Sequence, residues 1–167
     1  MAEPGQLVFV TVGTTSFDEL VEMIIRDECL RILHAHGYSR LRIQYGRGRV
    51  DPPAGLRCGV RIESYRYKDS IRQDLLDADV VISHAGAGSI MESLGLHKRL
   101  LVVINETLMG NHQTELAEEF AQEQFLHWST VRNLPNVLNA LNFSTIKHCE
   151  PGTPQKFAQF MDDFLQI

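Results

Sequence analysis

Blocks of apolar and polar positions alternate along the chain in a way that predicts strands and helices in turn. Continuous apolar and β-branched runs predict strands at residues 7–12, 41–45 and 100–104 and from residue 80, with weaker strands at 60–65 and 125–128. Helices are predicted after residue 16, at 69–76, after the glycine-rich loop at 86–88 with a stop at Gly95, and at about 111–124 and 131–141. Strands that are apolar throughout are covered on both faces. The alternation therefore predicts an α/β fold with one doubly wound parallel sheet, as a single domain over residues 1–167.

The first and the last predicted helices each have a recognisable N-terminal cap and an apolar stripe. Ser16 and Glu19 form a capping box that is expected to open the first helix. Its apolar stripe consists of Phe17, Leu20, Val21, Ile24 and Ile25. Thr153 before Pro154 predicts an amphipathic last helix at about 154–166. Its apolar positions are Phe157, Phe160, Met161, Phe164 and Leu165. Such a stripe most often packs on its own domain, although three phenylalanines also suit docking on a partner.

Composition narrows the classes of function. A net charge of -5 argues against a broad nucleic-acid-binding surface. Cys29, Cys58 and Cys149 lack the spacing of a zinc site or a disulfide framework, which suits a reducing compartment. No apolar run reaches the ~18 residues of a membrane helix, and no signal peptide is evident. We therefore expect a cytoplasmic protein without a membrane span.

The most informative segment follows the strand that begins at Val80. It continues as His84-Ala85-Gly86-Ala87-Gly88-Ser89 and leads into a helix. The bare backbone at Gly86 and Gly88 would let a bulky group approach, and helix amides favour negative charge. These features are typical of a phosphate site, although the same sequence pattern also suits a tight strand-to-helix turn.

Glu92 adds a carboxylate, expected in the first turn of that helix and one turn after Gly88. A carboxylate repels phosphate but accepts hydrogen bonds from two neighbouring hydroxyls, as a ribose offers. The commoner alternative is a solvated helix glutamate.

Two further loops are expected at the same sheet edge, where ligands bind in open α/β sheets. They are Gly13-Thr14-Thr15-Ser16 and the segment 105–113. In the second, Asn111, His112 and Gln113 either read the hydroxyls of a sugar or simply begin a helix. The segment 65–68, Tyr-Arg-Tyr-Lys, either flanks a base or diphosphate or is a surface loop.

Histidines offer little support for a metal site. His84 is a weak candidate for a base, and a phosphate contact or a structural donor are the alternatives. A zinc site of His84 and His112 has no third ligand in view, and His34 and His36 resemble the exposed end of a helix. We therefore expect no bound metal.

Four segments together resemble one family closely. They are FVTVGTTSFDEL, YRYKDS, ADVVISHAGAGSIMESL and LLVVINETLMGNHQTELAEEF. They resemble the soluble subunits of the eukaryotic dolichol-linked N-acetylglucosaminyltransferase, of the family 28 type. A more distant resemblance is to the carboxyl-terminal domain of the bacterial N-acetylglucosaminyltransferase that completes lipid II.

The resemblance implies the Rossmann-like donor half of a GT-B glycosyltransferase divided between two chains. This chain would bind UDP-N-acetylglucosamine (UDP-GlcNAc). A membrane-anchored subunit would supply the acceptor site and recruit it to the cytosolic face of the endoplasmic reticulum. The reaction would transfer N-acetylglucosamine to dolichyl-diphospho-N-acetylglucosamine with inversion, forming a β1,4 link without a cofactor or metal. It would be the second step in building the lipid-linked precursor for protein N-glycosylation.

The resemblance also implies roles for individual residues. Glu92 would hold the ribose hydroxyls, residues 86–89 would face the diphosphate, and His112 with Gln113 would contact the sugar. Gly13, Thr14 and Thr15 would face the cleft between the two halves. The tail helix, with Phe157, Phe160 and Phe164, would hold the membrane partner.

One catalytic component is missing from this chain. Inverting transfer needs a base on the acceptor hydroxyl, and the acceptor-side domain is absent. We therefore expect the base on the partner subunit. A non-catalytic nucleotide-binding or scaffold protein remains the alternative. A dinucleotide-dependent oxidoreductase is disfavoured because the first strand ends in Gly13-Thr14-Thr15 and not in the required glycine pattern.

Overall fold

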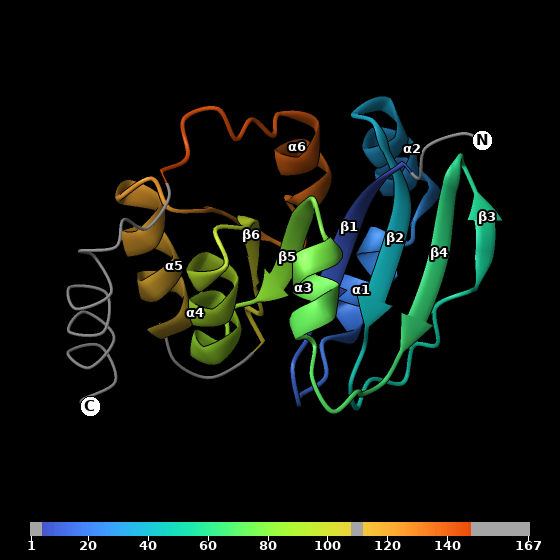
Figure 1. Ribbon diagram of the computed structural model, residues 1–167, viewed down its shortest axis with the longest axis horizontal. Coiled ribbons are helices and arrows are strands. Elements are labelled where there is room, and N and C mark those ends of the chain that lie inside the picture. The colour runs from blue at the N-terminus through green and yellow to red at the C-terminus, as the bar shows by residue number, and fades with distance from the viewer. Residues whose placement is uncertain (1–4, 108–111, 148–167) are drawn as a thin grey trace.

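The computed structural model describes residues 5–107 and 112–147, which form a seven-stranded sheet with helices on both faces (Figure 1). The strands are β1 (Gln6–Thr11), β2 (Tyr38–Gln44), β3 (Gly55–Arg57), β4 (Val60–Tyr65), β5 (Val80–His84), β6 (Arg99–Ile104) and β7 (His127–Thr130). The helices are α1 (Asp18–Ile24), α2 (Asp27–Ala35), α3 (Arg72–Asp77), α4 (Ala87–Gly95), α5 (His112–Gln122) and α6 (Leu134–Asn139).

The strand order is β3-β4-β2-β1-β5-β6-β7. Every neighbouring pair is parallel except β3 with β4, which is antiparallel. The predicted α/β architecture with a parallel sheet is therefore confirmed. The short edge strand β3 is an addition that the sequence pattern does not predict.

Alternate residues of the central strands supply two separate cores. In β1, Val8 and Val10 pack on one face of the sheet and Phe9 packs on the other. The first face is covered by α1, α2 and α6, and the second by α3, α4 and α5 (Figure 1). This two-sided burial explains why the strands are apolar at nearly every position.

The first helical region differs from the prediction. The prediction that Ser16 and Glu19 form a capping box is wrong. Helix α1 begins at Asp18, after Phe17, and no side chain caps it. Two contacts hold the preceding residues out of the helix, because Phe17 is buried in the core and the Thr15 carbonyl accepts the Arg47 amide at 3.0 Å. A second helix, α2, then forms where no separate helix is predicted.

Other boundaries shift by a few residues. The expected strand at 125–128 lies at His127–Thr130, since Phe125 packs on Phe120 with ring centroids 6.4 Å apart. The expected helix at 131–141 is shortened to α6, which has Pro135 in its first turn. Within the described residues no helix has the length and apolarity needed to cross a bilayer. The predicted tail helix at 154–166, with Phe157, Phe160, Met161 and Phe164, lies outside the described residues.

Candidate functional site

The candidate site lies where the direction of strand addition reverses. From β1 the chain adds β2 and β4 on one side and then crosses to β5, β6 and β7 on the other. The carboxyl ends of β1 and β5 are therefore neighbours, with Thr11 opposite Ser83. Ligands of open α/β sheets bind at such a switch point. Of the predicted loops, those containing Gly13 and Gly86 flank it directly.

The Gly13 loop is held by Gln44, a residue that sequence reasoning misses. The Gln44 side chain is buried and its oxygen accepts from the Thr11 hydroxyl at 2.5 Å and the Gly13 amide at 3.0 Å. Its nitrogen donates to the carbonyls of Gly13 and Arg66, both at 2.8 Å. One amide side chain thus ties the loop after β1 to the loop after β4. Polar and apolar residues alternate towards the end of β2, so the sequence pattern does not set Gln44 apart.

His84 fills the space between the two glycine loops. A Cβ atom on Gly13 would lie 2.8 Å from His84 Nε2, and one on Gly86 would lie 2.3 Å from His84 Cε1. Gly13 also has a φ of 66°, in the left-handed region that favours glycine. The bare backbone at Gly86 therefore accommodates the protein's own imidazole ring.

The His84 ring lies in a restricted environment. Burial lowers the pKa of its imidazole below the ordinary value, so the ring is neutral near pH 7. Its Nε2 atom lies 3.4 Å from the hydroxyl oxygen of Ser89 in the first turn of α4. His84 thus connects the loop after β1 with the start of α4.

The start of α4 retains the features of an anion site. Gly86 is the N-cap residue and no side-chain oxygen caps the helix, so its first amides lack a side-chain acceptor. Nothing lies within 4 Å of the Cβ position of Gly88. The expectation that Glu92 lies in the first turn is wrong, because α4 begins at Ala87 and has no acidic residue in its first turn.

Glu92 instead projects into a cavity of about 310 Å³. The cavity is lined by Gly13, Thr14, Gln44, Tyr67, Lys68, Asp69, Ser70, Ile71 and Glu92. Its volume is at the lower end of the range of small-molecule sites, about 300–1,000 Å³. Glu92 is half-buried, and its carboxylate has no hydrogen-bond or ion-pair partner among the described residues. An unpaired carboxylate in such a cavity is available to accept hydrogen bonds from a ligand.

The side chains of the segment 65–68 point in different directions. The Tyr67 hydroxyl lies 3.5 Å from the Thr14 carbonyl oxygen, across from the Gly13 loop, and Lys68 is beside it in the cavity lining. Arg66 turns away and donates to the carbonyls of Gly46 and Gly48 at 3.0 and 2.9 Å. Only part of this segment therefore faces a possible ligand.

The remaining predicted residues are not among those that line this cavity. Thr15 and residues 84–89 are not among the residues that line it. His112 and Gln113 are the first residues of α5, and Asn111 lies outside the described residues. The expected helix at 69–76 begins later, at Arg72, which leaves residues 69–71 to line the cavity. Within 5–107 and 112–147, no three His, Cys, Asp or Glu side chains are grouped to hold a metal.

Curated relatives share the sequence over most of this chain. The UDP-N-acetylglucosamine transferase subunit ALG13 of Mus musculus is 52% identical over 126 residues, covering 75% of this chain and 11% of the mouse protein. The protein of the same name from Yarrowia lipolytica is 33% identical over 168 residues, covering 95% of this chain and 86% of its own. This chain thus spans about a tenth of the mouse relative and most of the yeast one.

Solved structures share the fold. The NMR solution structure of ALG13 is 25% identical, with a TM-score of 0.72 and 95% of each chain covered. MurG from Acinetobacter baumannii is 17% identical, with a TM-score of 0.70, and the match covers 98% of this chain and 51% of MurG. The model of the glycosyltransferase family 28 C-terminal domain matches residues 7–164. The resemblance noted in the sequence is thereby confirmed, and the chain belongs to the family of glycosyltransferase family 28 C-terminal domains.

Proposed function

We propose that this chain is the donor-binding subunit of a glycosyltransferase that uses UDP-GlcNAc. The observation that carries the proposal is the position of Glu92 in a cavity at the switch point, where its carboxylate has no partner in the part of the chain that the structure describes. The relatives named as UDP-N-acetylglucosamine transferase subunits support the choice of donor.

The parts of the donor are assigned to separate elements. Glu92 accepts hydrogen bonds from the two ribose hydroxyls. The first amides of α4, at residues 87–89, face the diphosphate, where the positive end of the helix stabilises negative charge. His112 and Gln113 contact the sugar, with Asn111 beside them. The sugar assignment rests on the family resemblance.

The transfer itself requires a proton acceptor and a stabilised leaving group. A base removes the proton from the acceptor hydroxyl, whose oxygen forms the new bond to the sugar C1 as the bond from C1 to the phosphate oxygen breaks. UDP leaves with the bonding electron pair, and the amides of α4 stabilise its charge. We assign the base to the partner subunit, because His84 is enclosed by the two glycine loops and Ser89. The mechanism contains no metal step.

The acceptor and the partner complete the proposal. We propose that the acceptor is dolichyl-diphospho-N-acetylglucosamine, bound by a membrane-anchored subunit on the cytosolic face of the endoplasmic reticulum. The name "subunit" in the relatives supports a partner. The apolar tail positions Phe157, Phe160, Met161 and Phe164 are assigned to its binding.

The substitution Glu92→Ala tests the ribose assignment. Losing two charge-assisted hydrogen bonds should lower kcat/KM for UDP-GlcNAc about 100-fold or more in the assembled enzyme. Glu119→Ala is the matched control, since Glu119 is an exposed glutamate on the outer side of α5. Thermal melting and co-purification with the membrane subunit should be unchanged in both variants. Unimpaired transfer by the Glu92 variant would overturn the ribose assignment.

Two further measurements distinguish the classes of function. Titration of the wild-type chain with UDP-GlcNAc and with NAD separates a sugar-nucleotide site from a dinucleotide site. A transfer assay with and without the membrane subunit separates an enzyme subunit from a binding protein without turnover. We expect the wild-type chain to bind UDP-GlcNAc but not NAD. We expect sugar transfer only when the membrane subunit is present.

A further inference from the structure

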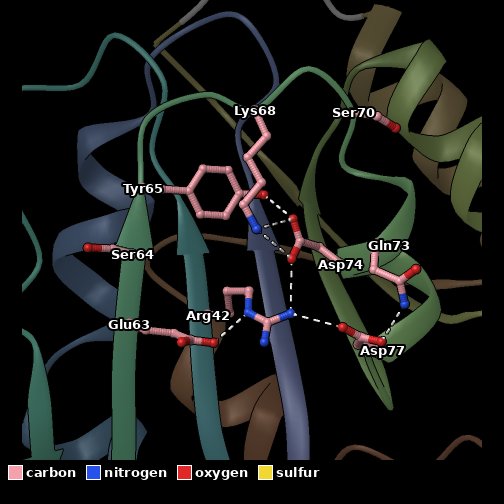
Figure 2. A pocket seen from close by; sticks show the side chains of 9 residues that line it. All are labelled: Arg42, Glu63, Ser64, Tyr65, Lys68, Ser70, Gln73, Asp74 and Asp77. Carbon is pink, nitrogen blue, oxygen red and sulfur yellow. Dashed lines mark hydrogen bonds and ion pairs between the residues drawn. The ribbon is translucent and has the colours of Figure 1, made fainter.

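The cavity that contains Glu92 is called the donor cavity below, and residues 67–71 form part of its lining. A buried carboxylate lies directly behind these residues. Asp74, in α3, is only 3% exposed (Figure 2). It accepts a hydrogen bond from the Tyr65 hydroxyl, and Lys68 Nζ lies 3.2 and 3.3 Å from its two carboxylate oxygens. Arg42 Nη1, from β2, donates to it at 2.9 Å. Asp74 is thus the common acceptor of three side chains, one from β2, one from the end of β4 and one from the loop that follows β4.

Two of these three side chains belong to the chain that turns from β4 into the donor cavity. Tyr65 is the last residue of β4, and Lys68 follows three residues later. The Lys68 ammonium also lies 4.2 Å from the centre of the Tyr65 ring. Asp74 therefore contacts both ends of the segment 65–68, and the Tyr67 side chain between these ends is 50% exposed.

The segment 67–71 separates two cavities. On one side is the donor cavity with Glu92; on the other is a polar cavity of about 270 Å³ that contains Asp74 and Arg42. Lys68 and Ser70 line both. A change in how Asp74 holds Lys68 therefore changes the wall of the donor cavity, without any contact between Asp74 and a ligand.

The surrounding charges make Asp74 the specific anchor of this wall. Arg42 also pairs with Glu63, and its Nη1 lies 3.4 Å from Asp77 Oδ2, so it keeps two carboxylates when Asp74 is neutral. Among residues 5–107 and 112–147, neither Tyr65 nor Lys68 contacts a second carboxylate. Burial and the Asp74 carboxylate both raise the pKa of the Tyr65 phenol, so it stays protonated and donates.

We propose that Asp74 is a positioning residue of the donor site, which holds Tyr65 and Lys68 so that residues 67–71 are in place before the nucleotide binds. The proposal rests on the proposed function of the same cavity. A wall ordered in advance lowers the entropic cost of binding, so its loss weakens donor affinity more than turnover.

The test compares three variants of the full chain in complex with its membrane subunit. Asp74→Asn removes the charge at constant size, and Tyr65→Phe removes only the hydroxyl. Asp77→Asn is the matched control, because Asp77 contacts Arg42 and Gln73 but neither Tyr65 nor Lys68. Calorimetry gives the Kd for UDP-GlcNAc and for UDP, and initial rates give KM and kcat.

We expect Asp74→Asn to raise Kd and KM about 10-fold and Tyr65→Phe about threefold, with kcat within twofold of the wild type. Asp77→Asn should bind as the wild type does. A general loss of structure would instead lower the active fraction, and so kcat, at unchanged KM.

The other possible results also decide whether Asp74 is a positioning residue. If Asp74→Asn does not fold, Tyr65→Phe decides, since it leaves the ion pairs intact. Wild-type Kd and KM in the folded variants would overturn the positioning role, as would a fall in kcat alone. If the wild-type complex itself binds neither UDP-GlcNAc nor UDP, the proposed function fails and this inference fails with it.

Discussion

At the scale of single residues, His84 shows how far surroundings determine a role. In the sequence it is a candidate base, phosphate contact or structural donor. In the fold its ring occupies the space that side chains at Gly13 and Gly86 would need, and its Nε2 lies near Ser89. The glycines and the histidine form one packed unit that joins the loops after β1 and β5. A residue type suited to acid-base chemistry here holds two ligand-facing loops together.

The neutral, buried His84 predicts a pH dependence of stability. Because burial lowers its pKa in the folded state, the unfolded chain binds a proton at a higher pH than the folded chain does. The free energy of unfolding should therefore fall as the pH drops below the ordinary histidine value of about 6.5. In His84→Gln this part of the fall should be absent. Urea unfolding of both proteins from pH 8 to pH 5 measures it, and equal slopes would contradict the prediction.

At the scale of secondary structure elements, the buried strands were the most predictable part. Their apolar runs reflect cover on both faces, and the loops of the candidate site follow from the strand ends. Features that depend on distant contacts were not predictable. The carbonyl of Thr15 is bound by Arg47, so Ser16 does not cap α1. The sequence makes Glu92 a candidate, but the cavity into which it projects depends on residues 67–71, which come from another loop.

Gln44 is the clearest case of such a distant contact, and it gives a prediction for stability. Gln44→Ala should lower the free energy of unfolding by about 2–3 kcal/mol, since it leaves the buried carbonyl of Gly13 without its donor and removes the links to Thr11 and Arg66. Gln6→Ala is the matched control, because Gln6 is exposed at the other end of the sheet and should change stability by less than about 0.5 kcal/mol. Urea denaturation midpoints of the two variants and the wild type measure the difference. Equal midpoints would contradict the role of Gln44 in holding the two loops together.

At the scale of the whole molecule, the described residues line a cavity at one edge of the sheet. The cavity is bounded by the loops after β1 and β4 and by α4, all on the same chain. The structural match to MurG covers 98% of this chain but only 51% of MurG. Under the proposed function, the other half of the cleft and the catalytic base come from a second chain. The surface that holds that second chain is then as necessary for transfer as Glu92.

Deletion of residues 154–167 tests whether the tail supplies this surface. The apolar positions Phe157, Phe160, Met161 and Phe164 recur at helical spacing, and burying several phenylalanines contributes about 1.5–3 kcal/mol each to association. The truncated chain should lose co-purification with the membrane subunit and should lose transfer. It should still bind UDP-GlcNAc, because the residues that line the donor cavity all precede residue 93.

Alanine substitution of Phe157, Phe160 and Phe164 in the full-length chain distinguishes docking from a contribution to folding. If the tail docks on the partner, these substitutions should weaken co-purification while leaving the thermal midpoint and the Kd for UDP-GlcNAc unchanged. If the tail packs on its own domain, the thermal midpoint should fall together with donor binding. Normal co-purification of the truncated chain would rule out the docking role, and the partner surface would then lie within residues 1–153.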